Sequence, residues 1–263
     1  MATRSHTQST STPSVPQIAV LLAAALQILT PLLPQLGIGQ AIGSQSDAVR
    51  TLITPAGWAF AIWGALYTGA TVFAVYQALP SQHSNALLHR LRWPAAGAFL
   101  GNASWAAYTQ IYGLSAVSVV IIAATLACLL VIYRVFSAAT FNTGQRWCAY
   151  LPLSALTAWL TVATTVNIAA SLRFHGVEAG TAAPMFAAAI VVVAGIIGAA
   201  AIRAGRGNLP FAAVFLWALA AIFSAGGQDS ALVAVAAAVA AILVISGLFL
   251  GLRRGHSAGA TTD

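Results

Sequence analysis

Residues 54–67 read Thr-Pro-Ala-Gly-Trp-Ala-Phe-Ala-Ile-Trp-Gly-Ala-Leu-Tyr, and this aromatic stretch marks the point where a loop enters a long apolar segment. Two later apolar segments carry polar and aromatic residues of the same kind, Asn102 with Trp105 and Trp159 with Asn167. A helix that faces only lipid has no use for tryptophan and asparagine at its middle. The pattern therefore predicts an aromatic-walled pocket inside a bundle of membrane helices.

The composition predicts an integral membrane protein whose main partner is the lipid bilayer. Charged residues form 6% of the 263 positions, hydrophobic residues form 60%, and the mean hydropathy is +0.87. Soluble globular domains carry about 25% charged residues, so this chain lacks the charge to cover itself with a hydrated surface. A net charge of +7 would indicate nucleic acid in a soluble protein. Here the arginines fall between apolar runs and indicate membrane topology, so we expect no nucleic-acid partner.

The apolar runs define the fold class, because a spanning helix needs about 20 mainly apolar residues. Residues 1–15 are rich in Ser, Thr and Pro and are expected to form a disordered cytoplasmic tail. The run after them is either a signal peptide or a retained first helix; its near-spanning length and weakly charged lead favour the helix. We predict an all-α, polytopic transmembrane helix bundle of about eight spans, at 16–36, 55–79, 94–112, 115–136, 149–171, 183–203, 209–226 and 230–252.

The distribution of arginine tests this segmentation. With the N-terminus inside, only Arg50 and Arg173 fall in outer segments, and the inner segments hold Arg4, Arg90, Arg92, Arg134, Arg146, Arg203, Arg206, Arg253 and Arg254. This bias predicts a multi-pass protein of the cytoplasmic membrane with both termini in the cytoplasm. We interpret the basic inner loop 80–93 as an interfacial segment rather than as a metal or anionic-lipid site.

Prolines further constrain the helix ends. Pro55, Pro94 and Pro210 are expected at or near helix starts, where a missing N–H group costs nothing. Pro31 and Pro34 are expected to kink or end the first helix.

Aromatic residues of the second expected helix share one face. Phe60, Trp63 and Tyr67 lie at positions i, i+3 and i+7. Trp58 is nearer the outer end, where an interfacial aromatic belt also explains it. Trp63 and Tyr67 lie deeper, so a belt explains them poorly and a pocket explains them better.

Two amides lie deep in the third and fifth expected helices. Asn102 shares a face with Trp105, and Trp159 and Asn167, eight residues apart, lie within about 80° of each other around their helix axis. An asparagine in hydrocarbon must find a partner, which is either another helix or a ligand. Helix-to-helix bonding and ligand binding both remain open for these residues.

Catalytic groups are scarce in the expected spans. No Asp, Glu or Lys lies inside any of them, and the histidines fall in tails or loops. Ion-coupled transporters keep ionisable residues along their pathway. We interpret Cys128 and Cys148 as small apolar fillers. We therefore expect no enzymatic activity, no metal site and no required cofactor.

Three motifs in this order and on these helices resemble the TspO/MBR family, that is, the tryptophan-rich sensory proteins and the mitochondrial translocator proteins. They are Trp58-Ala-Phe60…Trp63…Tyr67, Asn102-Ala-Ser-Trp105 and Trp159…Asn167. The resemblance covers residues 16–172, the family's five helices. It leaves residues 173–252 as a three-helix membrane extension and residues 253–263 as a cytoplasmic tail.

Departures from the family pattern limit what carries over. Thr54-Pro55 stands where the family has Pro-Pro, and the two tryptophans of the second helix are five residues apart instead of six. The sterol-associated Tyr and basic residue are missing after Asn167. Cholesterol recognition is therefore not implied.

The resemblance implies a five-helix bundle with a pocket for flat hydrophobic ligands, capped by loop 37–54. The implied ligand is a porphyrin or related tetrapyrrole, bound for sensing or carriage. The residues that match the family's pocket are Trp58, Phe60, Trp63, Tyr67, Asn102, Trp105, Trp159, Ala163 and Asn167.

Two other functions remain open. Eight spans with a polar-aromatic interior also suit a facilitative small-molecule permease. The sequence Gly247-Leu-Phe-Leu-Gly251 is a GxxxG pattern, which permits close approach between helices and would suit an assembly protein that docks a partner. The oligomeric state is open, with a homodimer as one alternative.

Overall fold

The computed structural model describes residues 14–259, with side chains as far as residue 254. Within this range every regular element is helical, which confirms the predicted all-α bundle. The tail expected over residues 1–15 falls outside the described range except for its last two residues. Of these, Ser14 is already the N-cap of the first helix.

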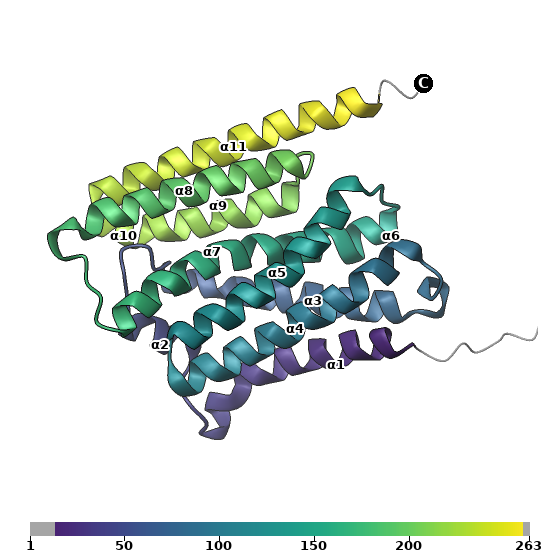
Figure 1. The fold of residues 1–263 in the computed structure, drawn as a ribbon, viewed down its shortest axis with the longest axis horizontal. Helices are drawn as coiled ribbons and strands as arrows, with labels where there is room; N and C mark the ends of the chain where they lie inside the picture. Colours follow the sequence, from purple (N-terminus) through teal and green to yellow (C-terminus); the bar gives the residue numbers. More distant parts are fainter. Residues whose placement is uncertain (1–13, 260–263) are drawn as a thin grey trace, which may run out of the picture.

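Five long helices form the N-terminal part of the bundle (Figure 1). α4 packs between α1 and α5, and α7 packs against α5 and α3. A short α6 and a π-helical turn at Arg146–Tyr150 lead into α7. The five long helices are α1 (Val15–Leu29), α3 (Ile62–Ala78), α4 (Ala86–Tyr112), α5 (Ala116–Ala138) and α7 (Leu151–Phe174), and α6 spans Thr143–Gln145.

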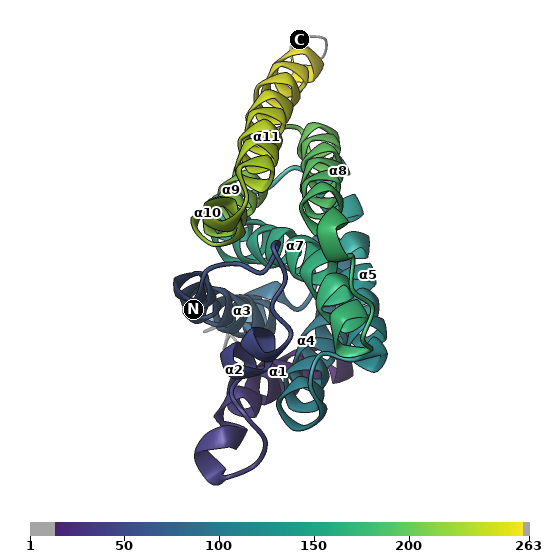
Figure 2. The ribbon, with the colours of Figure 1, turned by 90° about the vertical axis from the view of Figure 1, so that its left-hand side faces the viewer.

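The C-terminal helices pack on the far side of α7 from α1 (Figures 1 and 2). They are α8 (Ala183–Ala204), α9 (Leu209–Ser224) and α11 (Ala231–Gly259), with the one-turn α10 (Gly226–Asp229) between the last two. α9 contacts α7, and α8 pairs with α11. α11 continues past residue 252, so the first part of the expected tail 253–263 is helical; residues 260–263 lie outside the described range.

Seven helical segments of the described chain are long and apolar enough to cross a membrane. α4 is not among them, although we predicted a span at 94–112. Its buried polar residues, Asn102, Thr109 and Gln110, lower its mean hydropathy. At 27 residues it has more than spanning length, and it packs between two of the seven, α1 and α5. We therefore count α4 as the eighth crossing.

The start of α4 corrects a prediction. Pro94 lies inside the helix, because Asn85 begins the helix more than two turns earlier. The Asn85 side-chain oxygen accepts the N–H groups of Leu87 and Leu88 at 3.1 and 3.2 Å, which satisfies donors that a helix start leaves free. The interpretation of 80–93 as an interfacial loop is therefore wrong for most of its length.

Arg92 is 1% exposed and lies in α4, so it is not the residue of a basic loop that we predicted. Its guanidinium donates to the Gln77 Oε1 atom at 3.2 Å and to the backbone carbonyls of Gln77 and Gln82 at 3.2 and 2.8 Å. These acceptors lie at and just beyond the C-terminus of α3, where the helix dipole favours a cation. Arg92 thus joins α4 to the end of α3.

The segment between α1 and α3 lies across one end of the bundle (Figure 2). It begins with a 3-10 helix at Thr30–Leu36 that holds Pro31 and Pro34, so the first α-helix ends where we predicted. It continues through α2 (Ile42–Ala48) and a 3-10 turn at Gly57–Ala61 into α3.

Close contacts between α8 and α11 use the glycines that we considered for partner docking. A Cβ atom added at Gly247 would lie 2.6 Å from the Ala199 carbonyl oxygen, and one added at Gly195 would lie 2.6 Å from the Ala240 Cβ atom. Gly251 meets the backbone of Gly207. The GxxxG pattern therefore packs within the chain, so these two glycines are not free to contact another protein.

Replacement of Gly247 by alanine should destabilise the bundle. The Ala199 backbone cannot move away from the new methyl group without shifting α8, and overpacking of this kind costs about 1–3 kcal/mol. Unfolding of the purified protein in mixed detergent micelles measures the change. Gly64→Ala in α3 is the matched control, because no atom lies within 4 Å of its added Cβ. An equal loss of unfolding free energy in both variants would contradict the close packing of Gly247 on α8.

Candidate functional site

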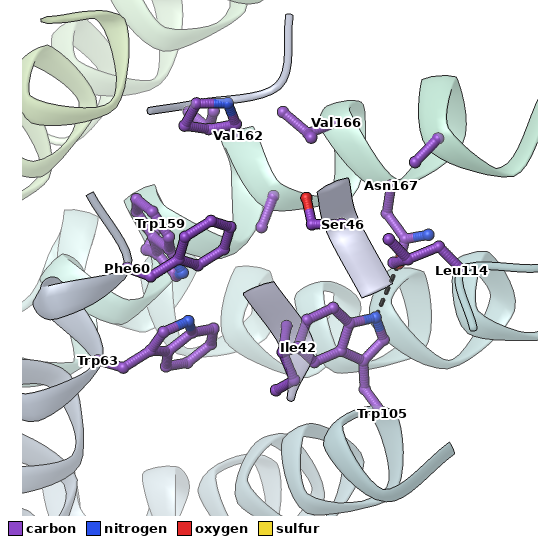
Figure 3. Close-up of a pocket in the computed structure, with 13 residues that line it drawn as sticks. Ile42, Ser46, Phe60, Trp63, Trp105, Leu114, Trp159, Val162, Val166 and Asn167 are labelled. Atoms are coloured by element: carbon purple, nitrogen blue, oxygen red, sulfur yellow. Dashed lines mark hydrogen bonds between the residues drawn. The ribbon is translucent and has the colours of Figure 1, made fainter. Parts of the chain in front are cut away.

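Three indole rings from three helices meet inside the bundle (Figure 3). Trp63 of α3 lies between the other two: its ring centroid is 6.3 Å from that of Trp105 on α4 and 5.9 Å from that of Trp159 on α7. Trp105 is 6% exposed and Trp159 is 3% exposed. The rings therefore face a shared interior and not the acyl chains of the bilayer.

Next to these rings is a cavity of about 50 Å³, which we call the aromatic cavity. Six of the nine residues predicted for the pocket line it. They are Phe60, Trp63, Trp105, Trp159, Ala163 and Asn167, and the remaining lining consists of Ile42, Ser46, Pro55, Leu114, Val162, Val166 and Ala170.

One face of α7 supplies half of this lining. From Trp159, steps of three, four, seven, eight and eleven residues reach Val162, Ala163, Val166, Asn167 and Ala170, which is the spacing of a single helix face. We did not predict Val162, Val166 and Ala170 as lining residues, although the helical period counted from Trp159 indicates them. Ile42, Ser46 and Leu114 come from connecting segments and leave no such signal.

Asn167 fixes the orientation of Trp105. Its Oδ1 atom accepts the Trp105 indole N–H at 2.7 Å, and its Nδ2 group donates to the Ser118 Oγ atom at 2.8 Å. Ser118 in turn donates to the Ser115 carbonyl at 2.7 Å. The amide thus links α4, α5 and α7, and the acceptor atom that a ligand could use is already occupied.

The indole N–H groups of Trp63 and Trp159 are buried and have no acceptor. Both rings line the cavity (Figure 3), but their nitrogens are closed off from its free space. Three other buried polar side-chain atoms of the described chain also lack partners, but none belongs to a lining residue. An unpaired buried donor costs about 1–3 kcal/mol, so these two groups favour a ligand that carries hydrogen-bond acceptors.

Three predicted site residues do not line the cavity. Asn102 is 1% exposed and donates to the Gln27 Oε1 atom of α1 at 3.3 Å, so it joins helices. Tyr67 packs on Trp63 at 5.2 Å, and its hydroxyl interacts with Asn102. Trp58 is 47% exposed and lies against Trp217 of α9. Helix periodicity alone does not show that neighbouring side chains engage these residues.

The connecting segment covers the cavity, as expected of loop 37–54. Ile42 and Ser46 of α2 and the adjoining Pro55 form part of the lining. The Gln40 N–H group and the Gln45 side chain both donate to the Gln110 carbonyl of α4, at 2.8 and 3.2 Å. These bonds hold α2 over the end of the bundle.

The chemistry of the lining suits binding of an apolar molecule. No charged side chain lines the aromatic cavity, and Ser46 is its single hydroxyl. Among residues 14–254, no three His, Cys, Asp or Glu side chains converge on a position that could hold a metal ion. Aromatic and aliphatic surfaces are the features that a ligand in this cavity would meet.

Asn167→Leu should cost about 1–3 kcal/mol of unfolding free energy, because it leaves the buried Trp105 N–H without an acceptor. In combination with Trp105→Phe the loss should be smaller than the sum of the single losses by roughly 0.5–3 kcal/mol. Detergent unfolding of the four proteins measures this cycle. Thr164→Val on the same helix is the control, since its hydroxyl bonds only within α7; strict additivity would show that the bond carries no energy.

Comparison with known proteins identifies the family of this chain. The model of the family described as TSPO-like protein matches residues 15–250. No curated protein and no solved structure matches the chain. The family match runs from α1 into α11, so the likeness is not confined to residues 16–172 as we expected, and α8 and α9 fall within it. The chain belongs to the TSPO-like protein family.

Proposed function

We propose that this membrane protein binds a flat, largely apolar ligand of the porphyrin or related tetrapyrrole class in the aromatic cavity, as a sensor or a carrier. The observation that carries the proposal is a cavity walled by three indoles, two of which, Trp63 and Trp159, have buried N–H groups without an acceptor. A flat ring system stacks on such walls. Its ring nitrogens or carbonyl oxygens would accept from the two donors.

The lining also argues for binding rather than catalysis. Ser46 is accompanied by neither histidine nor carboxylate in the lining, and a serine nucleophile requires a neighbouring base. The absence of charge further favours a neutral ligand face over a carboxylate, because a buried carboxylate needs a charged or hydrogen-bonded partner.

A tetrapyrrole requires the cavity to open. The present volume of about 50 Å³ accommodates about three to five water molecules, whereas pockets for drug-sized ligands measure about 300–1,000 Å³. Helix α2 is the element best suited to move, because the hydrogen bonds that hold it on α4, from Gln45 and from Gln40 just before the helix, both end at the Gln110 carbonyl. Binding would therefore displace Ile42 and Ser46.

Trp63→Phe and Trp159→Phe should each weaken binding roughly fivefold to tenfold, since each removes one hydrogen-bond donor and keeps an aromatic ring. Protoporphyrin IX and its dimethyl ester are the probes, and the shift of their absorption band gives the affinity. The ester should bind at least as tightly as the free acid, because no cation lines the cavity.

Trp147→Phe is the control, because Trp147 is exposed and its replacement should leave the affinity for porphyrin unchanged. Equal affinity of both site variants and the native protein would place the porphyrin elsewhere. Saturable uptake of other solutes into vesicles without porphyrin binding would favour the permease instead.

Ala163→Phe should abolish binding while the melting temperature stays within a few degrees of the native value. The new ring projects from the lining of α7 into free space, so it competes with the ligand rather than with packed side chains. Thermal unfolding and porphyrin titration are measured on one preparation. Ile168→Phe, on an exposed part of the same helix, is the control; undiminished binding to Ala163→Phe would exclude this cavity.

A further inference from the structure

Residues 52–59, which lead into the cavity, lie against the C-terminal helices. The Trp217 indole N–H of α9 donates to the Ala59 carbonyl at 3.2 Å. The Trp217 ring also meets the Trp58 ring edge to face, with centroids 4.8 Å apart and an interplanar angle of 89°. These contacts join positions 158 residues apart in the chain.

A backbone bond reinforces this contact. The Ala56 N–H group donates to the Ala221 carbonyl at 3.0 Å. α9 ends at Ser224, and the Ala225 N–H group bonds to the Ile222 carbonyl. The Ala221 carbonyl therefore belongs to the last turn of a helix, where acceptors lack intrahelical donors. Ala56 supplies the missing donor.

Residues 52 and 53 add two packing contacts. Gly226 of α10 approaches the Leu52 carbonyl so closely that a side chain at this glycine would overlap it. Ile53 is 2% exposed and lines a small apolar cavity together with Val191 of α8 and Phe215 of α9. Backbone and side chains of residues 52–59 are thus both fixed by the C-terminal helices.

The other half of the connecting segment has a different support. Residues 40–48 bond instead to the Gln110 carbonyl of α4. Between the two halves, Asp47 and Arg50 form an ion pair at 3.5 Å whose side chains are 70% and 46% exposed. An exposed junction of this kind contributes little rigidity.

We propose that α9 and α10 hold residues 52–59 as a fixed rim of the aromatic cavity, with Trp217 as its positioning residue, while α2 moves alone to admit ligand. This gives the C-terminal helices a role in the site, because Pro55 and Phe60 line the cavity from the rim or directly beside it. The part that concerns ligand access rests on the proposed porphyrin binding. The part that concerns the rim does not.

Hydrogen–deuterium exchange of the full-length protein in detergent tests the rim without any ligand. Trp217→Phe removes the bond to the Ala59 carbonyl, so exchange in peptides covering residues 52–60 should rise roughly fivefold to tenfold. Exchange over residues 40–48 should stay unchanged. Trp93→Phe is the control, because Trp93 is 60% exposed and distant in sequence from both segments.

Gln45→Ala provides the reciprocal test. It removes the side-chain bond to the Gln110 carbonyl, so exchange should rise over residues 40–48 and stay unchanged over residues 52–60. Gly226→Ala should act like Trp217→Phe through steric overlap with Leu52. If Gly226→Ala fails to fold, Trp217→Phe and Gln45→Ala decide the question by themselves.

Porphyrin kinetics form a second readout. Gln45→Ala should raise the association and dissociation rates together severalfold, and Trp217→Phe should lower affinity. If either variant raises exchange in both halves of the segment, or in neither half, the proposal that the rim is held separately from α2 is wrong. Absence of porphyrin binding in the native protein, with the exchange pattern as expected, would overturn the proposed ligand and leave the rim standing.

Discussion

Hydrocarbon offers no water to bond a polar side chain, and the arrangement of this bundle follows from that constraint. Several buried amide side chains find a partner on another helix. Asn167 bonds to Trp105 and Ser118, Gln17 bonds to the Gln77 carbonyl, and Asn208 bonds to Ser154. These bonds are spread over α1, α3, α4, α5, α7 and the start of α9, so they specify which helices are neighbours where apolar packing alone discriminates weakly.

The same constraint explains a buried arginine with no carboxylate beside it. Arg92 donates to Gln77, Gln82 and the more distant His83 carbonyl at 3.5 Å. Carbonyls at the end of α3 thus provide the negative ends of dipoles in place of an acidic residue. With four acidic residues in the whole chain, backbone acceptors are the available means of compensating such a charge.

Polar pairing is incomplete around the aromatic cavity. Trp105 is held by Asn167, whereas the buried N–H groups of the lining residues Trp63 and Trp159 have no acceptor. The C-terminal helices contribute to this site indirectly, through the contact of α9 and α10 with residues 52–59. The family match over residues 15–250 agrees with a single architecture that includes these helices.

The sequence by itself determined the membrane class, the helical segments and the three indole-bearing helices, because hydropathy and helical period are local properties of the chain. It could not decide that Asn102 joins helices while Asn167 fixes Trp105, that Trp58 turns to Trp217, or that Gly247 packs on Ala199. Nor could it place Arg92 in the interior, because that depended on the end of α3 lying beside α4. Each of these outcomes depends on which residues of helices distant in sequence become neighbours, and only the tertiary packing decides that.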